Sequence, residues 1–240
     1  LMQADKVSVS PSLLGFLAGK IVLNRVSLVN PVIMLEQSAE GKINIPQLDS
    51  KGQAPKVYLA GLTIRNGTVI FIDKKVDARG FKTILTDINA DVFKVPFPVN
   101  SMRANFKVSA SFLNLSSAKI GDINFTGWVD FGPKDMDAVL RLQDLDLTYF
   151  RPYYGNFLSD SQLDSARLNI RSVFSAQNND LEIIAAFKLS DLVYAQPGSQ
   201  DAQITSFDIA KSALDLFTDA KGELALEFKL KTKLDSPGFN

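Results

Sequence analysis

The segment ELALEFKLKTKL, residues 223–234, alternates apolar and polar side chains over twelve positions. Leu224, Leu226 and Phe228 share one parity, and the glutamates and lysines share the other. Successive side chains of a strand point to opposite faces, so the pattern predicts a β-strand with one apolar and one charged face. Burial of one large apolar side chain is worth roughly 1.5–3 kcal/mol. The apolar face therefore needs a cover, which is either more protein or a ligand.

The same alternation recurs along the chain, in segments 103–112, 123–131, 168–171 and 181–189. Repeated half-buried strands of this kind predict a sheet with one continuous apolar face. The candidate residues that line this face are Phe106, Val108, Phe112, Ile123, Phe125, Val129, Phe131, Leu181, Ile183, Phe187, Leu189, Leu224, Leu226, Phe228 and Leu230.

The pattern also predicts how the strands connect and bend. Asn66-Gly67 separates two alternating segments, and this dipeptide is typical of a type I′ hairpin turn because both of its residues adopt positive φ. We expect an antiparallel hairpin there. One parity runs from Ile84 and Thr86 to Val92, which predicts a regular strand. The apolar parity slips between residues 142 and 145, as expected where a β-bulge adds one residue and bends the strand.

Helical signals are few. A serine, Pro11 and Gly19 predict the start and the end of a short helix over residues 10–19. A second helix is predicted over 206–222, where an apolar stripe ends at a lysine and a glycine. Residues 149–158 indicate a turn or a single helical turn, because a proline and a glycine interrupt them.

Two Gly-, Pro- and polar-rich stretches, 37–56 and 94–101, are candidate linkers. We divide the chain into an N-terminal region, 1–98, and a C-terminal region, 99–240. Both consist mainly of alternating strands, so we expect them to form one continuous structural unit.

Composition excludes several classes of function. The chain has 240 residues, a net charge of zero, no His and no Cys. Zero net charge favours no nucleic-acid partner, and the missing residue types exclude most hydrolase and zinc-enzyme mechanisms. Phosphate-binding glycine motifs are also absent. We therefore expect a non-enzymatic protein without cofactor or metal. The sequence contains no apolar run of eighteen residues, so none of it is expected to span a membrane.

Two carboxylate pairs, Asp144 with Asp146 and Asp135 with Asp137, have a spacing that could act on a sugar or hold calcium. Alternation alone produces such pairs, and we interpret them as part of a solvated strand face.

Other polar or aromatic residues have similarly plain interpretations. Trp128 lies on the polar parity, and packing under a helix or loop is favoured over a partner contact. Tyr153 and Tyr154 are interpreted as turn packing. The three lysines at 229, 231 and 233 are interpreted as protection of an edge strand against aggregation, and an anion site is the alternative.

Residues 12–48 followed by 57–76 resemble the amino-terminal region of bacterial AsmA-like proteins. The resemblance lies in the order and spacing of a small loop with Leu-Leu, a Gly-Lys, a strand, a proline, a strand, a Gly-x-x-Asn motif and then an n-G-x-v-x-f-x-D hairpin. The matching residues are Pro31, Gly41, Asn44, Gly67 and Asp73.

Residues 207–239 are similar to the helix, D-x-x-G, strand and D-P-x-F signature of an uncharacterised branch of the same superfamily, with Ser236 inserted after Asp235. The segment before it, 147–174, is similar to the P-Y-x-x-x-L … G-x-L motif of that branch. Asp164 or Ser165 stands where the branch has glycine.

This resemblance implies a protein of the bacterial periplasm whose long sheet forms an open groove. It also implies a tether to the inner membrane through a segment outside this sequence. Relatives are implicated in carrying phospholipid between membranes or in maintaining the outer membrane, so phospholipid and other envelope proteins are the expected partners.

We therefore predict a mostly-β fold: a long antiparallel curved sheet that forms an open groove, a half-pipe, with two or three short helices. The predicted function is to bind or conduct phospholipid acyl chains, because a trough of aliphatic and aromatic side chains suffices for that task. The alternative is a structural or assembly module of an envelope complex without lipid cargo. A carbohydrate-binding β-sandwich is a third, less favoured class, since its aromatics and carboxylates would cluster in loops.

Overall fold

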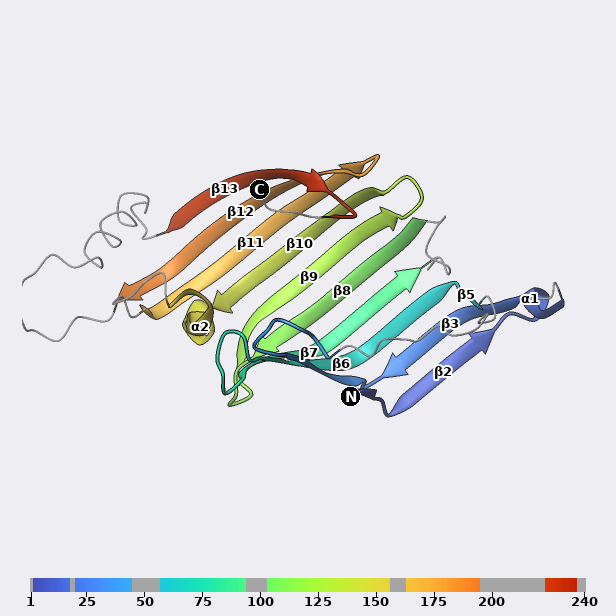
Figure 1. Ribbon diagram of the computed structural model, residues 1–240, viewed down its shortest axis with the longest axis horizontal. Coiled ribbons are helices and arrows are strands. Elements are labelled where there is room, and N and C mark those ends of the chain that lie inside the picture. The colour runs from blue at the N-terminus through green and yellow to red at the C-terminus, as the bar shows by residue number, and fades with distance from the viewer. Residues whose placement is uncertain are drawn as a thin grey trace, which may run out of the picture.

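The computed structural model describes residues 2–17, 20–44, 57–93, 103–155, 163–194 and 223–236. Thirteen strands form one open, curved sheet (Figure 1). The described helices are short: α1 (Leu13–Leu17), the 3-10 helix η1 (Leu147–Phe150) and α2 (Arg151–Tyr154). None of them is long and apolar enough to cross a membrane. The predicted mostly-β fold with one long open sheet is confirmed, whereas the helix predicted at 206–222 lies outside the described residues.

The strands are β1 (Met2–Gln3), β2 (Lys6–Pro11), β3 (Ile21–Val29), β4 (Val32–Gln37), β5 (Val57–Leu59), β6 (Gly61–Asp73), β7 (Phe81–Phe93), β8 (Arg103–Leu113), β9 (Lys119–Asp130), β10 (Asp135–Asp146), β11 (Leu163–Gln177), β12 (Asp180–Tyr194) and β13 (Leu224–Lys233). From β6 to β13 each strand pairs with the next one along the chain, and each of these pairs is antiparallel. β11 and β12 have fifteen residues each, a length of about 50 Å at roughly 3.3 Å per residue.

The N-terminal edge departs from the predicted antiparallel pattern. β3 pairs with β2 in an antiparallel manner, but β3 and β4 both run parallel to β6, and β3 also runs parallel to β5. β1 pairs with β4 at the outer side. The two short strands β1 and β2 therefore lie along one edge of the sheet, and β13 forms the other edge (Figure 1).

The hairpin predicted at Asn66-Gly67 is wrong, because β6 runs through this dipeptide without turning back. Asn66 adopts a φ of 54° at a bulge, and Asn30 in the neighbouring strand path adopts 49°. The Asn66 side-chain amide donates to the Asn30 side-chain oxygen at 2.8 Å, and the Thr68 amide donates to the Pro31 carbonyl at 2.7 Å. These hydrogen bonds join the two strand paths where they kink. Each path continues as a strand beyond its kink.

β7 has a third kink, beside the kinks at Asn30 and Asn66. Asp87 has a φ of 52°, and the register with β8 shifts between Thr86 and Asn89. The single parity predicted for segment 84–92 is therefore wrong, since Leu85 instead of Ile84 faces the same side as Val92. Asparagine and aspartate tolerate this left-handed backbone conformation better than other side chains.

The bulge predicted between residues 142 and 145 of β10 is confirmed by a register shift at that place. Asp144 has a φ of 52°, and its amide donates to the Asn169 side-chain oxygen of β11 at 3.1 Å. Asp191 on β12 has a φ of 54°. Bulges increase strand twist and bend, so these kinks account for the curvature of a sheet this wide.

The buried part of the sheet is thin and consists mainly of small residues. None of the large side chains in the described ranges is completely buried, and six of the ten buried apolar residues are alanines. At Gly127 an added Cβ would lie 2.3 Å from the Asp137 carbonyl oxygen and 2.5 Å from the Ala138 Cβ. β9 and β10 therefore approach each other too closely here for any side chain on β9.

Three turns at one end of the sheet are joined through Asp235, which follows β13. Its carboxylate accepts from the Lys134 ammonium at 2.6 Å and from the Asn179 side-chain amide at 3.0 Å. The Leu234 amide donates to the Asn179 carbonyl at 3.0 Å. The hydrogen bonds from Lys134, Asn179 and Ser236 lower the pKa of the Asp235 carboxyl to about 2. This aspartate, which belongs to the closing motif of the resemblance, ties the edge strand to the preceding turns.

We expect Gly127→Ala to lower the free energy of unfolding by about 3 kcal/mol, because its Cβ would overlap the β10 backbone. Gly61→Ala is the matched control, since the atom nearest to its Cβ would be the Asn24 carbonyl oxygen at 3.3 Å. Urea unfolding followed by circular dichroism measures both variants. Equal losses for the two variants would contradict the close approach at Gly127.

We expect Asp235→Asn to reduce stability most at neutral pH. A pKa of about 2, below the ordinary value of 3.8, means that ionised Asp235 stabilises the fold above about pH 4, and that this contribution disappears as pH falls through 2. The difference in urea midpoint between wild type and variant should narrow over this interval. Asp164→Asn, at an exposed residue of β11, is the control, and a difference independent of pH would contradict the prediction.

Candidate functional site

The strand register defines one apolar face that crosses the whole sheet, because cross-strand partners project to the same side. We call this surface the apolar face. On β6 to β13 its large residues are Leu62, Ile64, Val69, Phe71, Leu85, Val92, Phe106, Val108, Phe112, Ile123, Phe125, Val129, Met136, Leu140, Leu142, Leu145, Leu168, Ile170, Phe174, Leu181, Ile183, Phe187, Leu189, Leu224, Leu226, Phe228 and Leu230. It continues through β3 to Val7 and Val9 on β2.

The predicted lining residues fall on this face, apart from Phe131. Fourteen of them lie on β8, β9, β12 and β13 with the register given above. Phe131 lies in the turn after β9 and is 40% exposed.

The prediction omitted the apolar residues of β6, β7, β10 and β11. Their alternation is visible in the sequence, but the bulges shift its parity from one part of a strand to the next. Only the cross-strand pairing shows which residues lie side by side on the face: Leu142 pairs with Ile170, and Ile170 pairs with Phe187.

Aromatic rings spread over the small residues at the centre of the apolar face. Gly127 and Ala138 are cross-strand partners, and their row continues to Phe106 on one side and Phe174 on the other. Phe125 lies between these two rings, with its ring centroid 4.7 Å from that of Phe106 and 5.8 Å from that of Phe174. All three rings are only half-buried. They form the floor of an open surface instead of a closed core.

The apolar face is open at β13, the strand whose cover the sequence left undecided. Phe228 packs edge-on against Phe187 at 5.5 Å between ring centroids. Leu226 and Phe228 nevertheless remain 40% and 55% exposed. On the opposite face, Lys229 forms an ion pair with Glu182 at 2.8 Å. The three lysines of β13 do lie on an edge strand, where they pair with carboxylates of β12.

One end of the apolar face is closed by the segment that contains η1 and α2 (Figure 1). The Phe150 ring lies 6.1 Å from the Phe81 ring of β7 and 6.1 Å from the Phe112 ring of β8. Tyr149 and Tyr153 lie 5.3 and 5.4 Å from Phe81. We call these five residues the aromatic cap. The predicted turn at 149–158 thus folds over the sheet and covers neighbouring strands, as far as residue 155, where the described range ends.

A buried carboxylate anchors the aromatic cap. Asp73 is 4% exposed and accepts from the Tyr153 hydroxyl at 3.0 Å and from the Lys75 amide at 2.9 Å. Burial raises the pKa of the Tyr153 hydroxyl to about 12, and the adjacent Asp73 carboxylate adds to this effect. The sequence motif that ends in Asp73 therefore has a structural role here, which is to hold the cap against the end of β6.

The polar face carries charge pairs and structural carboxylates. Asp146 accepts from the Thr148 amide at 3.0 Å and so caps η1, and Asp135 accepts from the Asn178 amide at 2.7 Å. The Arg103 guanidinium lies 3.5 Å from the Trp128 ring centroid and stacks on the tryptophan. The described residues contain no group of three or more acidic side chains suited to a metal ion.

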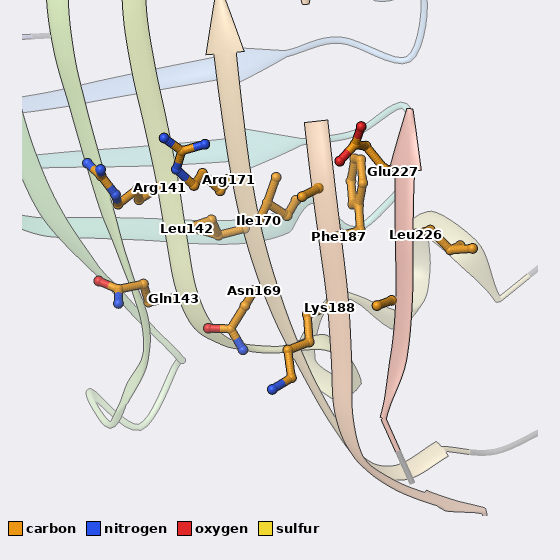
Figure 2. A pocket seen from close by; sticks show the side chains of 12 residues that line it. Arg141, Leu142, Gln143, Asn169, Ile170, Arg171, Phe187, Lys188, Leu226 and Glu227 are labelled. Atoms are coloured by element: carbon orange, nitrogen blue, oxygen red, sulfur yellow. The ribbon is translucent and has the colours of Figure 1, made fainter. Parts of the chain in front are cut away.

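A hollow of about 440 Å³ crosses β10 to β13 (Figure 2). It is centred on the row from Leu142 to Leu226, with Arg141 and Arg171 on one side of the row and Asn169 and Lys188 on the other. These flanking side chains project from the polar face, because their positions alternate with the row. The hollow therefore lies behind the apolar face and does not enclose it.

We expect Tyr153→Phe to lower the free energy of unfolding by about 1 kcal/mol, the usual worth of one hydrogen bond. Because the pKa of Tyr153 is raised to about 12, its protonated form stabilises the fold below about pH 10, and this contribution is lost as pH rises through 12. Urea midpoints of wild type and variant should therefore converge at alkaline pH. Tyr154→Phe, which removes only a hydrogen bond to Leu147 within the same segment, is the control. A Tyr153→Phe variant as stable as wild type at pH 7 would contradict the anchor.

No family model, curated protein or solved structure matches this chain.

Proposed function

We propose that this is a non-enzymatic protein of the bacterial cell envelope whose apolar face binds or conducts the acyl chains of phospholipids. The observation that carries the proposal is the apolar face itself, which is continuous from β2 to β13 and remains half-exposed. With the sequence resemblance, it favours a periplasmic protein tethered to the inner membrane by a segment outside this sequence.

The physical support comes from the hydration of this face. Val9 at one edge is 51% exposed and Phe228 at the other is 55% exposed. Water against such side chains costs about 25 cal/mol for each Å² of apolar surface, so an alkyl chain laid along them gains free energy without any polar contact. The aromatic cap closes one end, and a ligand enters from the opposite end or from the side.

The structural alternative is supported by the same exposure at β13. β13 is the edge strand of the described sheet, and edge strands can pair with a strand of another chain. A β-segment of a partner protein would extend the sheet there and cover the apolar side chains. This reading predicts a protein cover on the apolar face and no bound lipid.

The test uses a photoactivatable diazirine phospholipid, which crosslinks where its acyl chain lies. We expect crosslinks, mapped by mass spectrometry, on the apolar face of β8 to β13. A double variant, Leu226→Glu with Phe228→Glu, should reduce crosslinking on β12 and β13 by at least fivefold, because it places two charges among the acyl contacts.

Ala225→Glu is the matched control, since it adds a carboxylate on the same strand but on the polar face next to Lys188. It should leave crosslinking unchanged. Crosslinks on both faces alike, or equal loss in the control and the double variant, would overturn the proposal. Absence of phospholipid from gently purified protein, together with a stoichiometric protein partner, would establish the structural alternative.

A further inference from the structure

The helix α1 carries the most exposed apolar side chains of the described residues. Leu13, Leu14, Phe16 and Leu17 are 80%, 79%, 73% and 87% exposed. The helix projects at the extremity of the sheet, between β2 and β3 (Figure 1). A surface helix normally turns its large apolar residues toward the protein, and α1 does the reverse.

The local packing holds these side chains outward. Gly15 is the one residue of α1 without a side chain, and it faces the sheet, where an added Cβ would lie 2.6 Å from a Val22 methyl carbon. The Ser12 hydroxyl accepts from the Gly15 amide at 3.2 Å, and the Ser12 amide donates to the Val22 carbonyl at 2.8 Å. The glycine thus lets the helix backbone approach β3, and the four large residues point to solvent.

The surrounding chain is positively charged although the whole protein is neutral. Residues 12–25, which include α1 and the start of β3, contain Lys20 and Arg25 and neither Asp nor Glu, which gives this segment a formal charge of +2. The protein as a whole has 26 basic and 26 acidic residues. An apolar tip flanked by cations matches an anionic bilayer surface, where each nearby cation contributes about 1 kcal/mol.

We propose that α1 inserts into the surface of an anionic lipid bilayer. Four of the five residues of α1 are large, apolar and exposed. The hydrocarbon region of a bilayer can contact side chains on all sides of such a tip, whereas a flat protein surface would contact only one side. We name this tip, residues 12–17, the insertion tip.

The insertion tip lies at the end of the apolar face opposite the aromatic cap. β3 begins next to β5, with Ile21 beside Val57, and runs parallel to β6. The aromatic cap lies at the far end of β6, against Asp73. Insertion would therefore direct the end of the apolar face opposite the aromatic cap toward the membrane. Insertion itself does not depend on lipid cargo, so it can fail or succeed separately from the proposed function.

The first test is sedimentation of the full chain with sucrose-loaded vesicles. Vesicles of phosphatidylcholine alone and vesicles that also contain phosphatidylglycerol are compared. We expect Leu14→Ser combined with Leu17→Ser to lower binding to the anionic vesicles by roughly a hundredfold or more, because two large apolar side chains are lost. Lys20→Gln combined with Arg25→Gln should lower it roughly thirtyfold, with little change on neutral vesicles.

The matched control is Leu115→Ser, because Leu115 is 68% exposed in the turn between β8 and β9, away from the tip. It should bind as wild type does. Wild-type protein that does not sediment with either vesicle, or a control that loses as much binding as the tip variant, would overturn the proposal. A wild-type dimer that dissociates in the tip variant during analytical ultracentrifugation, without vesicle binding, would show that the tip contacts a second copy instead.

A second test measures depth. Phe16→Trp, in a Trp128→Phe background that removes the only native tryptophan, should give a blue-shifted emission on addition of anionic vesicles and be quenched by brominated acyl chains. Leu115→Trp in the same background should not respond. Equal responses of the two reporters would also overturn insertion.

Discussion

The antiparallel hydrogen-bonded ladder from β6 to β13 is the constraint on which the rest of this structure depends. Over the described residues the sheet is a single layer, and its buried apolar residues are mostly alanines such as Ala104 and Ala138. A two-layer protein gains most of its stability from a packed core, whereas here cross-strand contacts and turns carry a larger share. Each strand pairs with its neighbour in sequence, so the ladder grows by local hairpins and keeps the contact order low.

The bulges bend the strands while the ladder of hydrogen bonds continues on both sides of each bulge. Asn30, Asn66 and Asp87 adopt positive φ at adjacent positions of three strand paths, and their hydrogen bonds join one kink to the next. Each kink adds residues to one side of a pairing and flips the parity beyond it. The apolar face stays continuous because the apolar residues of a kinked strand change parity at its bulge, as Leu85 and Val92 do on β7.

The two ends of the apolar face differ in their chemistry. At one end, aromatic rings cover the sheet and the Tyr153 hydroxyl binds the buried Asp73 carboxylate. At the other, Gly15 packs against Val22 and turns four large side chains to solvent. The apolar face therefore has two chemically different ends: the aromatic cap covers one, and the exposed side chains of α1 lie beyond the other. This asymmetry supports passage of acyl chains along the strands more than a symmetric assembly surface.

The sequence by itself determined the strands, the segregation of apolar from charged side chains and the bulge after Leu142, because these follow from the local period of two and its interruption. It also indicated fourteen residues of the apolar face. Only the tertiary structure decided whether Asn66-Gly67 turns the chain or kinks it, since a hairpin and a bulge both use positive φ at asparagine. The tertiary structure also decided the parallel pairing of β3 with β6, the position of the aromatic cap and the exposure of α1. Those features depend on which distant strand lies alongside, and local alternation carries no information about that choice.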